Sequence, residues 1–368
     1  MVKEKQTPTK RVVIVHMRND LSGSTRVLSQ AIEALKDEAC QIDLYTATID
    51  YEGFLSDLPG VNIIPLPYSR YTRRWKSFNS YLYSQIWLFF KLLQYLGQPA
   101  VFYISTVLPF GASLSGWVMR KQVVYHLHEV SLAPAPWWLK KWLFGVVRLT
   151  ASKTIYVSHF LKEEKAFGNI ETVTIHNSLS HGFLNKAEAH KKSARDQKSI
   201  LMICSLAGYK GITEFFQLAK KCPHLNFDLV LNATQAEIER IFKDDLGPEN
   251  LTVHSAQRDV HQFYSRASIV VNLSDPRKHV ETFGMTLLEG MAYGLPCIAP
   301  PVGGVLELVE NGINGFLIDS SEIELISESI QKLVSSPALY RKMSNQAFEK
   351  SKSFKPAVFS KKVQKVFA

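Results

Sequence analysis

The sequence predicts an α/β protein built from two doubly wound, Rossmann-like domains that face each other across a cleft. With 368 residues, the chain is long enough for two or three domains, each with its own core. Its 46% of hydrophobic and 21% of charged residues are typical of globular proteins. Short apolar runs alternate with amphipathic stretches along the chain, which indicates parallel sheets with crossover helices.

The first domain is expected to contain a series of buried strands and to occupy residues 1–185. The strands are RVVIVHM (11–17), QIDLYTA (41–47), VNIIPLP (61–67), VFYIS (101–105), QVVYHLH (122–128), KTIYVS (153–158) and VTIHN (173–177). The turn LSGST (21–25) leads from the first strand into a helix over 26–38. The polar, charged segment NKAEAHKKSARDQKS (185–199) is interpreted as the interdomain linker.

The second domain is expected over residues 199–352 and repeats the alternation. Its strands are ILMICSL (200–206), FDLVLNA (227–233), LTVHSA (251–256), IVVNLS (269–274), PCIAP (296–300) and GFLID (315–319). Its helices are expected at 211–222, 235–245, 259–267, about 284–293, around 305–310, at 321–335 and at 338–352. The segment 353–368 is predicted to be a last helix that crosses back to the first domain.

Charged and aromatic residues are distributed unequally between the two halves of the chain. Residues 1–198 hold 25 Lys and Arg against 15 Asp and Glu, whereas residues 199–368 hold 18 of each. Glu129 is the one acid within 66–160, against 11 basic residues, and all six tryptophans lie in the first half. The four cysteines form no CxxC pair, which favours a reducing cytosol. No signal peptide is predicted, because the N-terminus reaches the first strand without an apolar region, and no membrane-spanning segment is predicted, because 81–97 is too short and too polar.

The stretch ETFGMTLLEGMAYGLPC (281–297) contains the most informative pattern. A helix that begins near Gly284 and Met285 presents unpaired amides and a partial positive charge, which suits a diphosphate. Glu281 precedes this helix, and Glu289 lies more than one turn inside it. The two carboxylates could hold sugar hydroxyls on either side of the diphosphate, Glu289 the ribose and Glu281 the transferred sugar. Alternatively, Glu289 faces solvent and Glu281 is an ordinary loop acid.

Residues 281–319 resemble the C-terminal signature of retaining GT-B glycosyltransferases of the family 4 type. The shared order is E-x-F-G-x-x-x-x-E-x-M-A-x-G-x-P, then G-G-x-x-E, then N-G-x-N-G-F-L. The resemblance implies a GT-B fold and a nucleotide-sugar donor. It also implies that Glu281 contacts the donor sugar and that Glu289 contacts the ribose. The donor-binding residues between them would be Phe283, Gly284, Met285 and Thr286.

The resemblance extends to a basic residue in the loop SLAGYKGITEF. Lys210 matches the lysine that neutralises the donor diphosphate, a role that suits a compact ammonium charge. Relatives often carry Gly-Arg further upstream, whereas this chain has Cys204-Ser205. A second phosphate-binding cation is therefore missing there, and Arg258, Arg277 and Lys278 are the candidates to replace it.

In the first half, the resemblance points to two strand ends. Gly23 in LSGSTR matches the glycine-containing loop after the first strand, where it serves either the ligand or only the turn. In YHLHE, His128 fits the position of a histidine near the reacting carbon, and His126 is interpreted as structural. SHF (158–160) and HN (176–177) match later strand ends. Gly303, Gly304 and Glu307 are interpreted as structural support.

The resemblance implies transfer of a sugar, with retention, from a UDP- or GDP-linked donor to an acceptor hydroxyl. Lys210, Glu281 and His128 are the expected catalytic residues, with no metal and no cofactor beyond the nucleotide-sugar substrate. The basic, aromatic segments 68–94 and 135–149 predict peripheral binding to an anionic cytosolic membrane surface and a glycan or lipid-linked glycan acceptor. Nucleic acid is not expected as a partner. The alternatives are a core role for the tryptophans, a nucleotide-sugar epimerase and an inactive membrane-docked scaffold.

Overall fold

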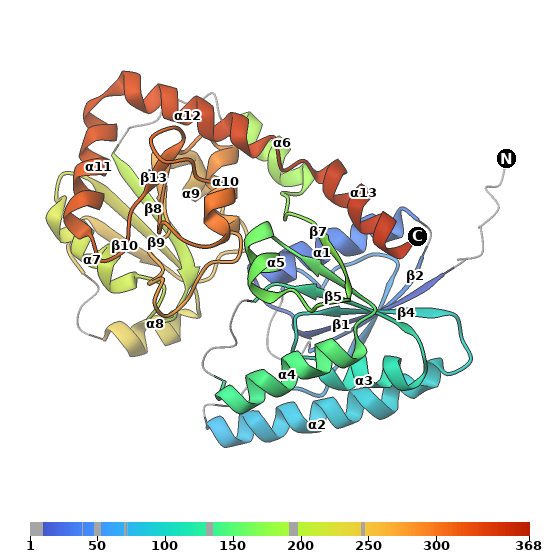
Figure 1. Ribbon diagram of the computed structural model, residues 1–368. Coiled ribbons are helices and arrows are strands. Elements are labelled where there is room, and N and C mark those ends of the chain that lie inside the picture. Colours follow the sequence, from blue (N-terminus) through green and yellow to red (C-terminus); the bar gives the residue numbers. More distant parts are fainter. Residues whose placement is uncertain are drawn as a thin grey trace. The chain divides into compact units, whose positions relative to one another are not determined.

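The computed structural model describes residues 10–38, 40–47, 53–69, 71, 73–129, 135–190, 198–243 and 247–368. The chain divides into two compact units (Figure 1). Unit 1 comprises Met1–His176 and Ala357–Ala368, and unit 2 comprises Asn177–Pro356. Each unit is built on one parallel sheet flanked by helices, and the fold is therefore the two-domain α/β fold that the sequence predicts.

Within the described residues, unit 1 has a seven-stranded sheet in the order β3-β2-β1-β4-β5-β6-β7. The strands are β1 (Arg11–Arg18), β2 (Gln41–Ala47), β3 (Val61–Pro65), β4 (Ala100–Ser105), β5 (Gln122–Leu127), β6 (Lys153–Tyr156) and β7 (Glu171–Thr174). β1 is central, with Val12 in parallel register with Ile42 on one side and Val101 on the other. Its apolar side chains are fully buried, as expected for a strand covered on both faces.

Helices cover both faces of this sheet. They are α1 (Gly23–Lys36), α2 (Arg74–Leu92), the 3-10 turn η1 (Leu93–Tyr95), α3 (Phe110–Val118), α4 (Trp137–Thr150), α5 (His159–Lys165) and α13 (Pro356–Phe367). Figure 1 shows α2, α3 and α4 together on one face, and α1 and α13 on the other. α13 is attached to α1, because the Gln364 side chain donates to the carbonyl of Ala34 at 2.9 Å.

The described part of unit 2 forms a six-stranded parallel sheet in the order β10-β9-β8-β11-β12-β13. The strands are β8 (Ser199–Ser205), β9 (Asn226–Asn232), β10 (Leu251–His254), β11 (Ile269–Val271), β12 (Cys297–Ala299) and β13 (Gly315–Leu317). The helices are α6 (His181–His190), α7 (Ile212–Lys221), α8 (Gln235–Phe242), α9 (His261–Arg266), α10 (Met285–Ala292), η2 (Gly304–Glu307), α11 (Ile323–Ser335) and α12 (Pro337–Ser351). The core lies between the sheet and α7, α11 and α12.

Several boundaries differ from those expected. Residues 177–185 belong with unit 2 rather than the first domain, because α6 packs against α9 and α10. The expected linker 185–199 is helical up to His190, and its residues 191–197 lie outside the described part of the chain. β7 covers 171–174 instead of 173–177. Over the described residues, none of the helices combines the length and the apolar character needed to cross a bilayer.

Candidate active site

Both sheets have a topological switch point, where the chain continues in opposite directions from neighbouring strands. In unit 1 this point lies between β1 and β4, and in unit 2 between β8 and β11. Open parallel sheets bind ligands beyond the carboxyl ends of such strands. The loops that follow these strands contain most of the residues singled out from the sequence.

In unit 2, the loops after β8 and β11 bring Lys210 and Glu281 together as an ion pair. Both side chains are largely buried, at 14% and 19% exposed. Gly211 makes this approach possible, because it adopts φ 76° and passes directly against the Leu273 carbonyl, where a Cβ would collide. The two loops also share a backbone bond, from the Asp275 amide to the Tyr209 carbonyl at 2.9 Å.

Charge fixes the protonation states of this pair. Burial raises the pKa of the Glu281 carboxyl, but the ammonium of Lys210 and the His279 ring lower it more, to about 2. Burial alone would lower the pKa of Lys210, but the effect of the Glu281 charge is larger in total, and the pKa of Lys210 lies above its usual value. The Glu281 carboxylate also accepts from Ser274 Oγ at 3.3 Å. Both groups are therefore charged across the physiological pH range.

The predicted anion site at the start of α10 has the expected backbone. Gly284 caps the helix in the left-handed region, with φ 98° and ψ 57°. Met285 and Thr286 form the first turn, whose amides have no acceptor within the helix. The Phe283 side chain is buried against Phe354, with ring centroids 5.5 Å apart. Only the backbone of Phe283 is thus placed to meet a ligand.

Glu289 is buried on α10, at 4% exposed, and does not face solvent. Tyr264 Oη, on α9, donates to its Oε2 at 2.7 Å. The same hydroxyl lies 3.1 Å from the Thr286 carbonyl, so Tyr264 links the carboxylate to the first turn of the helix. The sequence did not reveal Tyr264, because no local pattern connects it with Glu289, 25 residues away.

Gly303 and Gly304 support the loop that carries Glu281. The Gly304 amide donates to the Glu281 carbonyl at 2.8 Å. A Cβ on Gly304 would overlap the Thr282 carbonyl, and Gly303 has φ 94°. The two glycines are needed for close backbone contact, in agreement with the structural role expected for them.

Two of the three candidate second cations are bound elsewhere. Arg277 Nε and Lys278 Nζ lie 2.8 and 3.0 Å from the Asp275 carboxylate, and both side chains are about two-thirds exposed. Hydrogen bonds from Arg277 and Lys278 lower the pKa of Asp275 to about 2. Beside Lys210, burial raises the pKa of the Cys204 thiol to about 12, so Cys204 is a neutral neighbour of the ion pair.

In unit 1, a polar network closes the switch point between β1 and β4. His16 Nδ1 lies 3.0 Å from Ser105 Oγ, and its Nε2 lies 3.5 Å from Thr25 Oγ1. Asp20 accepts from Thr25 Oγ1 at 2.9 Å and from the Ser22 amide at 3.0 Å. Together these bonds fix the loop in front of α1, of which Gly23 is the exposed first residue. His16 and Asp20 were missed, although both stand at the end of the first strand.

His128 lies directly after β5, beside the network. Its ring centroid is 4.3 Å from that of His126. His126 is fully buried and its Nδ1 lies 2.6 Å from Tyr103 Oη, as expected for a structural residue. Burial, then the charges of His126 and His16, holds the pKa of His128 well below its usual value. Burial raises the pKa of the neighbouring Glu129 to about 7. His128 is a neutral imidazole at pH 7.

Thr106, directly after β4, is a second residue that the sequence did not reveal. It has φ 72°, although it is β-branched, and is buried. Its amide donates to the His126 carbonyl at 2.9 Å, and its Oγ1 accepts from the Leu108 amide at 3.3 Å. Such strain costs about 1–3 kcal/mol and is concentrated at functional sites.

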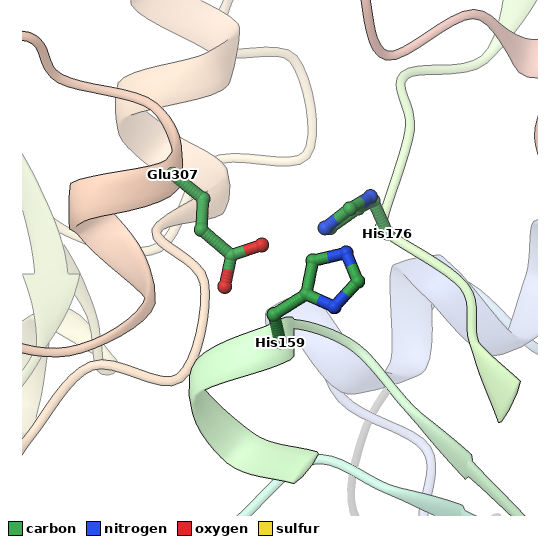
Figure 2. Close-up of side chains that lie close together, drawn as sticks. All are labelled: His159, His176 and Glu307. Atoms are coloured by element: carbon green, nitrogen blue, oxygen red, sulfur yellow. The ribbon is translucent and has the colours of Figure 1, made fainter. Parts of the chain in front are cut away.

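The strand ends at SHF and HN contribute a histidine pair. Ser158 is the N-cap of α5 and accepts from the Leu161 amide at 3.1 Å, so its role is structural. His159 and His176 approach edge to face, with ring centroids 5.0 Å apart (Figure 2). Glu307, also labelled in Figure 2, belongs to η2 of unit 2.

The two units, each built on one parallel sheet, have the GT-B fold, an α/β class, and the ion pair beside a glycine-capped helix is a candidate anion site. Residues 185–350 match the family model of "Glycosyl transferases group 1". This region, which is a little less than half of the chain, is therefore similar to the group 1 glycosyl transferases.

Comparisons with individual proteins agree with this family. An uncharacterized glycosyltransferase of Haemophilus influenzae is 28% identical over 209 residues, which are 55% of each chain. The N-acetyl-alpha-D-glucosaminyl L-malate synthase of Bacillus anthracis is 31% identical over 93 residues, 25% of this chain and 23% of that protein. The chain thus spans about half or less of these relatives. Anabaena HepE in complex with UDP-glucose is a structural neighbour, with a TM-score of 0.77, 17% identity and coverage of 97% and 99%.

Proposed function

We propose that this protein transfers a sugar from a nucleotide-sugar, UDP- or GDP-linked, to an acceptor hydroxyl. The observation that carries the proposal is the buried Lys210–Glu281 pair, because Glu281 is three residues before Gly284, the cap of α10. A lysine and a helix N-terminus suit a diphosphate, and a carboxylate suits sugar hydroxyls. The UDP and UDP-glucose complexes of HepE favour a UDP-linked donor.

Negative charge develops on the departing diphosphate, and fixed positive groups stabilise it. Lys210 and the first-turn amides of α10 would supply this stabilisation, so we propose a reaction that requires no metal and no cofactor. Glu281 would hold hydroxyls of the transferred sugar. Glu289, oriented by Tyr264, would hold the ribose.

We further propose retention at the anomeric carbon, with His128 beside the transferred sugar. A neutral imidazole can donate one hydrogen bond and accept another, whereas an imidazolium would repel the positive charge that develops on the sugar ring. The depressed pKa of His128 supports this role. Gly23, exposed at the start of α1, would allow close approach of the donor phosphate or the acceptor.

We propose a lipid-linked or cell-envelope glycan as the acceptor, reached from the cytosolic face of a membrane, with the protein bound peripherally and no nucleic acid as partner. The support is the basic, aromatic composition of residues 66–160.

Donor turnover tests the proposal. Release of UDP from UDP-sugars and of GDP from GDP-sugars is measured for the wild type and for Glu281→Gln, with EDTA present. The matched control is Glu324→Gln. Glu324 also forms an ion pair with a lysine, Lys221, but this pair is exposed. We expect a loss of about 100-fold or more for Glu281→Gln and none for the control. Equal turnover in both variants, or a requirement for metal, would contradict the mechanism; epimerised free donor without transfer would identify an epimerase.

A further inference from the structure

Helix α2 carries an apolar stripe on its solvent side. Its exposed large side chains include Trp75, Phe78, Leu82, Ile86 and Phe90, which are 37–65% exposed, and Tyr83 is exposed next to Leu82. Spacings of three and four residues place them along one face of the helix. Exposed single hydrophobic residues are common, but a continuous stripe of this kind indicates an interaction surface.

Polar contacts fix the orientation of α2, so the stripe is not a misplaced core face. Ser84 and Gln85 point into unit 1 and are 0% and 1% exposed. Gln85 Oε1 accepts from the Gly111 amide at 3.1 Å, and its Nε2 lies 3.3 Å from Met17 Sδ. If α2 rotated to bury the stripe, these bonds would break and the buried polar groups of unit 1 that they satisfy would lose their partners, which costs stability.

The neighbouring helices also carry exposed apolar side chains. α3 contacts both α2 and α4, and Figure 1 shows the three on the same face of the sheet. The exposed apolar side chains there are Trp117 and Val118 on α3, and Trp137, Trp138, Trp142 and Leu149 on α4. We call the exposed apolar residues of α2, α3 and α4 together the aromatic layer. Among the described residues, most exposed large apolar side chains of the chain belong to this region.

Basic residues accompany the aromatic layer. Lys76 and Lys91 lie on α2, and Lys140, Lys141 and Arg148 lie on α4. Since Glu129 is the one acid of segment 66–160, almost no carboxylate balances them. Two copies of this face would repel each other, which disfavours a self-associating dimer. Phosphate-bearing partners are favoured, and the apolar stripe distinguishes a bilayer from nucleic acid, whose backbone offers it no apolar contact.

We propose that the aromatic layer docks this protein onto an anionic lipid bilayer, with α2 and α4 lying in the plane of the interface. Tryptophan and phenylalanine insert at the headgroup level, and lysines and arginine bind the lipid phosphates. The biological role of this docking rests on the proposed function, because docking would bring the enzyme to a lipid-linked acceptor. The docking itself does not depend on that function.

The test is sedimentation of the full chain with vesicles of phosphatidylcholine alone or with roughly 30% phosphatidylglycerol added, because an anionic surface attracts nearby Lys and Arg residues. Phe90→Asp removes part of the stripe, and Lys140→Glu with Lys141→Glu reverses the charge. Ile241→Asp is the matched control, because Ile241 is 55% exposed but lies on α8 of unit 2.

We expect the wild type to bind anionic vesicles at least about tenfold better than neutral ones, and both α2 and α4 variants to lose about tenfold or more. Ile241→Asp is expected to bind as the wild type does. Thermal unfolding and vesicle-free UDP release, unchanged in all variants, show that folding and the donor site are intact. Equal binding to both vesicle types, equal loss in the control, a dimer abolished by Phe90→Asp, or preference for DNA over vesicles would overturn the proposal. Absent release of both UDP and GDP from their nucleotide-sugars, with intact vesicle binding, would instead overturn the proposed function.

Discussion

Replacing Gly304 with alanine tests whether the 303–304 turn positions the proposed donor site. The new Cβ would overlap the carbonyl group of Thr282 and lie 2.8 Å from the Phe283 amide nitrogen. Both neighbours are backbone, so no side-chain rotation relieves the overlap. The segment from Glu281 to Gly284 must therefore move away from η2, and the bond from the Gly304 amide to the Glu281 carbonyl is lost or lengthened.

Overpacking of this kind costs about 1–3 kcal/mol, and a misplacement of about 1 Å at a reacting centre can lower the rate about 100-fold. We expect Gly304→Ala to lower Tm by roughly 2–4 °C per kcal/mol lost and to reduce UDP release about 100-fold. Differential scanning fluorimetry and a coupled UDP assay, both well below Tm, measure the two effects separately.

Gly208→Ala is the control in the neighbouring loop. Gly208 has no positive φ, and a Cβ there would meet nothing within 4 Å. We expect it to leave stability and turnover unchanged. If Gly304→Ala keeps at least half of the wild-type turnover, the turn does not position the site and the reasoning is refuted.

Three further predictions follow from the contacts described. Lys210→Ala removes the cation that faces the buried Glu281 carboxylate, and should raise the pKa of that carboxyl from about 2. It should also slow UDP release about 100- to 1,000-fold. Unchanged turnover would exclude Lys210 from the reaction. Tyr264→Phe removes the 2.7 Å bond to Glu289 and should raise KM for the donor by about 3- to 10-fold with little change in kcat, by steady-state kinetics. Burial lowers the pKa of His16 to about 4 and of His126 to about 3, so on acidification these histidines bind protons in the unfolded chain before they do in the folded one. The free energy of unfolding, measured with urea, should therefore keep its full value above about pH 6.5 and decline below it. Replacing His126 by Gln should flatten that decline, and an unaltered slope would contradict the assignment.

Much of the fold could be predicted from the sequence, because buried parallel strands are continuous apolar runs. Each predicted strand is present, and α10 begins at Met285 after Gly284, as the anion-site argument requires. Lys210 and Glu281 meet, although 71 residues separate them, because β8 and β11 are neighbours in the sheet.

Other features depend on contacts that no local pattern encodes. The Tyr264 bond to Glu289 joins two helices, and the collision of a Gly304 Cβ with Thr282 depends on how two loops pass each other. Residues 185–190, the second part of the helix over His181–His190, are interpreted as linker from the sequence because they are polar and charged, and the packing of this helix on α9 and α10 overrides that composition. Local propensity is a weak guide where a few tertiary contacts decide.

Lys210 is not an isolated cation, because Glu281 neutralises it. In the proposed reaction, a diphosphate therefore exchanges with an internal counter-ion instead of capturing an isolated charge. The exchange makes the net free energy of nucleotide binding less favourable. It also allows Glu281 to pair again with the Lys210 ammonium when the product nucleotide dissociates. A built-in substitute anion thus favours turnover over tight product retention.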